Sequence, residues 1–379
     1  MYLSRRHFLF AGLAAPGFSA SKPPDRPNLV LILASGVPAW ALGCYGNREI
    51  RTPHLDRLAQ MGTRFANHFA AAPEPAVNLG TLLTGRTPMQ LGEAAALPAS
   101  EISLEKVLSG QGYACNHSGV AEAAAFLENP PTGKPFFLTV NLKPLEPPYP
   151  GTSAKYLDLY AQTRFDTVNP EGADAVPRLR NAAASISALD DDVQAIVSKL
   201  MQRKLLDRCL VLFTSTAGDP LSHHGLWGAV AGSDRVSMYE ESLATPMIWM
   251  WPGHVPAQAS RPELVSAYDL VPTLCETLSI DVPARNLCGR SYMLPATGKP
   301  LPKKRPWRTT VFAHYRNTGM ARTQRHKLVL RDDGKGPGEL YALIADPAEN
   351  INQYDNPQFV TIRNSLTTEW NGWKQRYSM

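Results

Sequence analysis

The sequence lacks several features that would assign a function directly. Its 379 residues contain no apolar run of about 18 residues, so we expect no transmembrane helix. The net charge of +5 is too small to indicate nucleic acid or a membrane surface as a partner. No Gly-x-Ser-x-Gly elbow, HExxH helix, internal repeat or low-complexity segment is present. Function must therefore be sought in the arrangement of less specific motifs.

Cysteine is also scarce, with five residues that form neither a CxxC pair nor a metal knuckle. Cys209 and Cys275 lie in apolar segments, where we expect them to pack as small hydrophobic side chains. One disulfide is compatible with an oxidising compartment, but the spacings select no pairing. Cysteine chemistry therefore supports no functional assignment.

The first 20 residues have the pattern of an export signal. Arg5 and Arg6 precede a short apolar run at residues 8–15, which gives way to Ser19 and Ala20. This arrangement is typical of twin-arginine signals, which export proteins that fold beforehand. The alternative is a basic N-terminus beside a chance apolar patch. We expect a bacterial periplasmic or secreted protein whose mature chain has no transmembrane segment.

Apolar runs alternate with helical patterns over the first three quarters of the chain. Continuous apolar runs are typical of strands buried on both faces, and they occur at residues 28–34, 135–142, 209–215 and 246–251. Helical patterns lie between them, at residues 53–62, 104–108 and about 179–206. The alternation predicts an α/β fold with a mixed, largely parallel sheet and helices on both faces.

Beyond residue 296 the apolar segments become shorter and are flanked by polar residues. Short, polar-flanked segments predict a small C-terminal antiparallel sheet, at residues 309–314, 327–331 and 339–343, and residues 357–377 predict a closing helix. The expected organisation is a signal peptide at 1–20, an α/β domain at 26–295 and a small α+β subdomain at 296–379.

Residues 71–88 lie where a strand is expected to give way to a helix. The segment from Leu82 to Arg86 predicts the end of that helix and a turn at Gly85. In open α/β sheets, ligands bind at such strand-to-helix connections. A nucleophile is therefore expected between Pro73 and Leu79, but no residue after Pro73 in this stretch carries a hydroxyl or a thiol.

Further motifs follow one another in a fixed order across residues 26–373. They are Leu42-Gly43-Cys44-Tyr45-Gly46, Thr52-Pro53-His54-Leu55, Leu83-Thr84-Gly85-Arg86, Lys134-Pro135-Phe136-Phe137, His224-Gly225-Leu226-Trp227-Gly228, Tyr239-Glu240-Glu241 and Glu339-Leu340-Tyr341. In this order they resemble the sulfatase family, within the alkaline-phosphatase-like superfamily. The resemblance covers nearly the whole chain beyond the leader, and it implies the same fold.

The resemblance also implies a specific chemistry. Sulfatases use a Cys or Ser converted to formylglycine in a Cys-x-Pro-x-Arg motif, with one calcium or magnesium ion. Aligned on Leu83-Thr84-Gly85-Arg86, Pro75 takes the nucleophile position and Leu79 the arginine position. Two further family positions, a Lys and a His, become Val120 and Leu145. None of these four side chains can perform the family's catalytic role.

The metal-ligand positions differ from the family in the same way. The family places carboxylates after two strands, and the matching residues here are Ser35, Gly36, Thr216 and Ala217. A hard dication needs several oxygen ligands, with carboxylates supplying the charge. We therefore expect neither the metal nor formylglycine as a cofactor.

A binding role remains open at these positions. Arg235 is a candidate anion contact that replaces the family lysine, although a shifted alignment would put Ala229 there. His224, Asn78, Ser35 and Thr216 are further candidates to line a polar pocket. Asp190, Asp191 and Asp192 are expected to form a solvated helix face, because consecutive helical residues point in different directions.

Three functions are compatible with the sequence. The first is an exported sulfatase-fold pseudoenzyme that binds an anionic or sulfated sugar, with no expected nucleic-acid partner. The second is a divergent sulfuric-ester hydrolase with carboxylates drawn from Glu74, Glu122, Glu146 or Asp219. The third is a structural or interaction protein with a sealed pocket. They are distinguished by whether Ser35, Pro75, Leu79 and Thr216 meet in an open pocket or the pocket is sealed.

Overall fold

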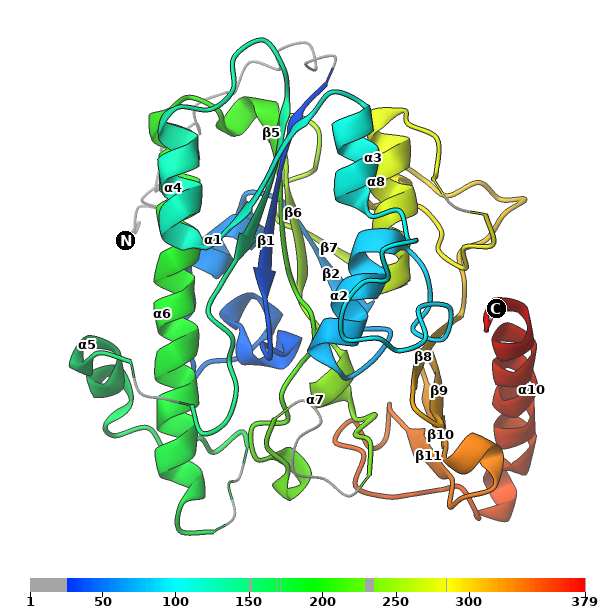
Figure 1. Cartoon of the computed structure of the whole chain (residues 1–379). Helices are drawn as coiled ribbons and strands as arrows, with labels where there is room; N and C mark the ends of the chain where they lie inside the picture. The colour runs from blue at the N-terminus through cyan, green and yellow to red at the C-terminus, as the bar shows by residue number, and fades with distance from the viewer. Residues whose placement is uncertain are drawn as a thin grey trace, which may run out of the picture.

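The computed structural model describes residues 26–149, 152–168, 170, 172–228, 235–283 and 285–378. Its centre is a seven-stranded sheet with the order β3-β4-β1-β5-β6-β2-β7 (Figure 1). The strands are β1 Asn28–Ala34, β2 Thr63–Phe69, β3 Ala114–Ser118, β4 Phe136–Asn141, β5 Cys209–Ser215, β6 Met247–Met250 and β7 Ala259–Ser266. Neighbours are parallel except for β6, which runs antiparallel to β5 and β2.

Helices cover both faces of this sheet (Figure 1). On one side lie α1, α4 and α6, and on the other lie α2, α3 and α8. The helices of this part are α1 Pro53–Gln60, α2 Pro75–Thr84, α3 Leu104–Gly110, α4 Val120–Glu128, α5 Ala154–Leu157, α6 Ala175–Gln202, α7 Glu240–Leu243, α8 Leu270–Leu278 and α9 Met293–Ala296. The sheet therefore forms the middle of three layers, as the sequence predicts.

Strand β1 shows why a continuous apolar run suits this position. Val30 and Ile32 belong to the hydrophobic cluster on the α6 side, whereas Leu29 and Leu31 belong to the cluster on the opposite face. All four side chains are fully buried. Successive strand residues point to opposite faces, so a strand covered on both sides has no position for a polar side chain.

The C-terminal part forms a second, four-stranded antiparallel sheet. Its strands are β8 Thr310–Tyr315, β9 Thr318–Thr323, β10 His326–Leu330 and β11 Glu339–Ala342, in the order β11-β10-β9-β8. Helix α10, Val360–Tyr377, packs against it through Trp370 and Trp373 (Figure 1). The predicted antiparallel sheet with a closing helix is confirmed, and so is the largely parallel main sheet.

Some features differ from the sequence predictions. Strands β2, β7 and β9 were not predicted, because polar residues interrupt their apolar patterns. The prediction of three solvated aspartates is wrong for Asp190, which is 1% exposed. Its carboxylate accepts the backbone N–H groups of His54 and Leu55 at 3.0 and 2.7 Å. Helix α6 crosses the first turn of α1 at this point, which buries the side chain.

Two predictions lie outside the described residues: the signal peptide at residues 1–20 and the alternative lysine position at Ala229. Among the described residues, no helix is both long and apolar enough to cross a membrane.

Candidate functional site

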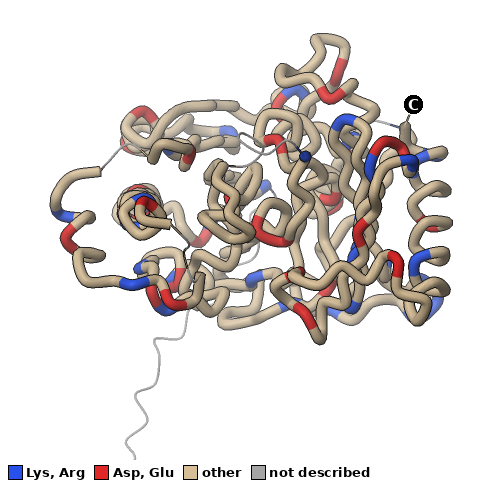
Figure 2. The backbone as a smooth tube through the Cα atoms, turned by 90° about the horizontal axis from the view of Figure 1, so that it is seen from below, with Lys and Arg blue, Asp and Glu red and all other residues tan. Residues whose placement is uncertain are grey.

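The candidate site lies where β1 and β5 end side by side, with Ala34 opposite Ser215. Figure 2 shows the molecule from below the view of Figure 1, the side toward which the β1 arrow points, with acidic and basic residues interspersed. Ser35 directly follows β1 and Thr216 directly follows β5. The backbone N–H of Thr216 donates to the carbonyl of Ala34 at 2.9 Å. The structure thus brings the two metal-ligand segments of the family alignment together.

At the first of these segments, the backbone of another loop occupies the space beside Gly36. The N–H of Leu145 donates to the carbonyl of Ser35 at 2.9 Å. Gly36 has φ +79°, and a Cβ added to it would lie 2.0 Å from the carbonyl oxygen of Leu145. Any side chain at position 36, including the family aspartate, would therefore overlap the Leu145 backbone. Leu145 itself is 5% exposed and packs into the core.

At the second segment, Asn78 ties the loop after β2 to the end of β5. Its Oδ1 accepts the N–H of Ala71 at 2.8 Å, and its Nδ2 donates to the carbonyl of Thr216 at 2.7 Å. Asn78 is fully buried. Ser215 makes a similar link, since its hydroxyl accepts the N–H of Val37 and donates to the carbonyl of Ala217. The Asn78 amide thus bonds two backbone groups on different segments.

Helix α2 presents Pro75 and Leu79 at the position of the family nucleophile motif. Pro75 is the first residue of α2, where proline is favoured because that N–H has no helical partner. Leu79 lies one turn later, half-buried, and packs against the hydrophobic cluster on this face. The helix ends at Gly85, with φ +73°, as the sequence predicts. The helix and the turn that the resemblance implies are therefore present, and the residues that it aligns with the reactive positions are a proline and a leucine.

The four metal-ligand positions do not suit a hard dication. Ser35, Gly36, Thr216 and Ala217 supply no carboxylate, and Ala217 is fully buried. The Thr216 hydroxyl is buried and has no hydrogen-bond partner among the described residues. A neutral hydroxyl from each strand end cannot balance two positive charges. The family metal therefore does not fit this site.

The carboxylates considered for a rearranged site do not form a metal-binding group among the described residues. Asp219 is fully buried, and it accepts the N–H groups of Leu221 and Gly228 and the hydroxyl of Tyr149. Burial raises the pKa of Asp219. Glu74 is the N-cap residue of α2, and Glu122 lies in the first turn of α4. Of these side chains, that of Asp219 is held by hydrogen bonds within the protein.

One His and Asp group has ligand atoms close enough for a metal ion: His54, Asp190 and Asp191. It lies between α1 and α6. The Asp190 oxygens already accept two backbone N–H groups, and Asp191 pairs with Lys155 at 2.6 Å. Burial raises the pKa of Asp190 to about 6. These contacts account for the group as the link between two helices.

The remaining predicted residues lie on other segments. Val120 is the first residue of α4, directly after β3 and Gly119. Arg235 is exposed, and it is the first residue of the described segment 235–283. His224 has φ +55°, and its ring stacks on Tyr239 with centroids 3.7 Å apart. The His224 Nε2 lies 3.8 Å from a Glu241 oxygen, too long for a hydrogen bond.

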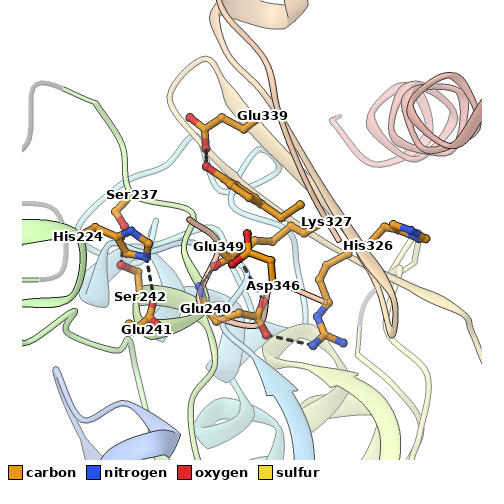
Figure 3. A network of polar contacts seen from close by, with 12 residues as sticks. His224, Ser237, Glu240, Glu241, Ser242, His326, Lys327, Glu339, Asp346 and Glu349 are labelled. Atoms are coloured by element: carbon orange, nitrogen blue, oxygen red, sulfur yellow. Dashed lines mark hydrogen bonds and ion pairs between the residues drawn. The ribbon is translucent and has the colours of Figure 1, made fainter. Parts of the chain in front are cut away.

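Next to His224 lies a network of buried charges that sequence reasoning did not find (Figure 3). Lys327 of β10 is fully buried, and its Nζ lies 2.5 Å from Glu349 and 3.2 Å from Glu240. Arg322 of β9 pairs with the same Glu240 at 3.0 Å. Glu240 opens α7, so the network joins the main domain to the second sheet. Lys327 follows Arg325 and His326 in the sequence, a context typical of an exposed strand end, so nothing in the sequence indicates its burial.

Burial and ion pairing shift the pKa values of this network in opposite directions. Burial alone would lower the pKa of Lys327, but Glu349 and Glu240 outweigh it and hold that pKa above its ordinary value. Burial would raise the pKa of Glu240, but Lys327 and Arg322 keep it low. For Glu349 burial dominates, and its pKa is raised to about 8.

We expect the Glu349 carboxyl to make stability fall as the pH rises. The group titrates near 4.3 in the unfolded chain and at about 8 in the folded one, so the folded state retains a proton between these values. Its stabilisation is complete below about pH 4.3 and is lost as the pH rises to about 8. Glu349→Gln should flatten this dependence in urea unfolding at pH 5 and 8, whereas exposed Glu276→Gln should leave it unchanged. Equal slopes for all three proteins would contradict the expectation.

Comparison with known proteins agrees with this geometry. A protein solved in complex with its substrate D-glucosamine-2-N,6-O-disulfate superimposes with a TM-score of 0.78, covering 93% of this chain and 98% of that one at 19% identity. At this identity the likeness shows the fold alone. The two proteins therefore share one α/β fold over nearly their whole lengths.

Sequence comparison identifies the family. The sulfatase profile matches residues 27–120 and 117–280, and that of N-sulphoglucosamine sulphohydrolase, C-terminal, matches residues 228–376. Arylsulfatase A of Homo sapiens is 28% identical over 367 residues, 77% of this chain and 71% of that protein. Steryl-sulfatase of Mus musculus is 41% identical over 116 residues, 27% of this chain and only 19% of that protein. The chain belongs to the sulfatase family.

Proposed function

We propose that this protein is an exported pseudoenzyme of the sulfatase family that binds an anionic or sulfated sugar without hydrolysing it. The observation that carries the proposal is Pro75 at the start of α2. The nucleophile of the family motif belongs there, and proline has no side-chain group that could attack sulfur or be converted to an aldehyde. The twin-arginine pattern of the leader supports export.

The surroundings of Pro75 support the same proposal. The Leu145 carbonyl excludes a ligating side chain at Gly36. The Asn78 amide bonds the backbone of Thr216, so it holds the strand end in place. Loss of the nucleophile, the metal ligands and the assisting Lys and His together is difficult to reconcile with the family reaction. A divergent hydrolase would need carboxylates near Ser35, and the described residues gather none there.

We propose sugar binding as the role of this part of the molecule. His224 is half-buried against Tyr239, and Arg235 is exposed nearby in the sequence. A guanidinium is suited to an oxyanion such as a sulfate ester. A structural neighbour was solved with a disulfated glucosamine, which makes that class of sugar the first ligand to test.

Activity is tested on full-length protein coexpressed with a formylglycine-generating enzyme. We expect well under one calcium or magnesium ion per chain by elemental analysis, and no turnover of an aryl sulfate. Arylsulfatase A, assayed in parallel, controls for the substrate and buffer. Stoichiometric metal together with turnover that a chelator abolishes would overturn the proposal in favour of a divergent hydrolase.

Binding is tested by calorimetry with glucosamine disulfate. We expect saturable binding that Arg235→Gln weakens by about tenfold, the loss of one charge-assisted contact. Arg305→Gln, at an exposed arginine of a distant loop, is the matched control. Absence of binding in the wild type would instead favour a structural or interaction protein with a sealed pocket.

A further inference from the structure

A cavity lies at the end of the main sheet where β4, β1 and β5 begin. Its volume is about 500 Å³. The lining residues are Arg26, Asn28, Pro130, Pro131, Thr132, Gly133, Lys134, Pro135, Phe136, Leu205 and Arg208. The candidate site described above lies at the other ends of these strands, so the two features are separate.

Each of the three strands is preceded by one cation. Arg26 lies just before β1, Lys134 just before β4, and Arg208 directly before β5. The strands are neighbours in the order β4-β1-β5, with Leu29 opposite Phe137 and also opposite Leu210. Parallel pairing therefore brings together three positive charges from segments that are distant in the sequence.

No carboxylate lines the cavity, and no ion pair to Arg26, Lys134 or Arg208 occurs among the described residues. Asp25 precedes Arg26 and lies outside those residues. One N–H group of Arg26 donates to the carbonyl of Gln111 at 2.6 Å. This bond holds the guanidinium group and leaves its other N–H groups to donate to a ligand. Mutual repulsion of three cations is relieved when an anion enters.

The cavity wall is rigid. Pro130, Pro131 and Pro135 have fixed φ angles, and the Asn28 side chain accepts the N–H of Phe136 at 3.0 Å, which joins the first residues of β1 and β4. The backbone of the wall is thus constrained, so the ordering that opposes binding of a small ligand is confined to the cationic side chains.

We propose that this cavity binds the sulfate or phosphate group of a small ligand. Two guanidinium groups and an ammonium group provide charge-assisted hydrogen bonds to a tetrahedral oxyanion. The recess accommodates a group about the size of a monosaccharide behind the anion. A flat membrane surface fits less well, because no large, exposed hydrophobic side chain lines the cavity.

Calorimetry on the full chain, at constant ionic strength, tests the proposal with inorganic sulfate, inorganic phosphate, glucosamine 6-sulfate and glucosamine 6-phosphate. We expect saturable binding of at least one, which the triple variant Arg26→Gln, Lys134→Gln, Arg208→Gln weakens by at least about tenfold. Tighter binding of a sugar ester than of the free ion assigns the ligand as an ester, and equal binding assigns it as an ion.

The matched control is Lys303→Gln, Lys304→Gln, Arg305→Gln, which removes the same charge from an exposed loop. It should change affinity less than twofold. Equal weakening by both triple variants, or no saturable binding of any probe, would overturn the proposal. Because all three cavity cations are exposed, the variants are expected to fold, and thermal unfolding verifies this. The single variants Lys134→Gln and Arg208→Gln repeat the binding test with only one substitution in each protein.

Discussion

Replacing Lys327 with methionine is expected to lower the free energy of unfolding by about 3–5 kcal/mol. Lys327 is fully buried and is the cation between Glu240 and Glu349. Methionine has similar length, so little packing volume is lost. The cost comes from the Glu240 carboxylate, which keeps Arg322 but loses the Lys327 charge in a dry environment, and from the Glu349 carboxyl, which loses its partner. Urea unfolding at pH 7 measures the change.

The matched control is Lys303→Met, at an exposed lysine, where we expect a change within about 0.5 kcal/mol. Adding Glu349→Gln to Lys327→Met should change the stability little at pH 7, because the Glu349 carboxyl, with a pKa of about 8, is already largely protonated there. The free energy of unfolding lost in Lys327→Met should be smaller at pH 5 than at pH 7, because a buried carboxyl binds a proton more readily at the lower pH. If Lys327→Met resembles the exposed control, the network does not hold the two sheets together.

Gly36→Ala is expected to destabilise the fold by at least about 3 kcal/mol. Two effects add: φ +79° is unfavourable for alanine by about 1 kcal/mol, and the new Cβ would lie 2.0 Å from the Leu145 carbonyl. That carbonyl belongs to a loop whose N–H is bonded to Ser35, so it cannot move away freely. Chemical unfolding measures the loss.

Gly253→Ala measures the first effect, the positive φ, alone. Gly253 has φ +77°, nearly that of Gly36, but nothing lies within 4 Å of its added Cβ. It should therefore cost only about 1 kcal/mol. Similar losses at the two glycines would show that the Leu145 loop yields, and the family aspartate could then be accommodated at position 36. A large difference supports the view that the metal position is closed by backbone.

These two predictions address the same feature of the molecule. Both concern contacts within the protein that stabilise the fold. At the strand ends, backbone and amide hydrogen bonds connect the loops, as at Asn78. Between the two sheets, Lys327 and its partners connect the domains through buried charges.

The apolar runs of the sequence were sufficient to predict strands β1, β4, β5 and β6, because a strand covered on both faces requires apolar residues throughout. They could not predict β2, in which Arg64, Asn67 and His68 interrupt the pattern. They also gave no direction for β6, since strand direction depends on the pairing partner. The ordered motifs compensated for this, because family resemblance carries the whole topology.

For the candidate site, the sequence by itself determined which chemical groups are missing, since Pro75 and Leu79 cannot act as nucleophile or anion contact in any conformation. Only the tertiary structure decided what takes their place. The closure beside Gly36 depends on Leu145, and the burial of Lys327 depends on Glu240 and Glu349, all distant in sequence. The convergence of Arg26, Lys134 and Arg208 likewise depends on the strand order. Side-chain identity is local information, whereas burial and charge balance arise only when separate segments pack together.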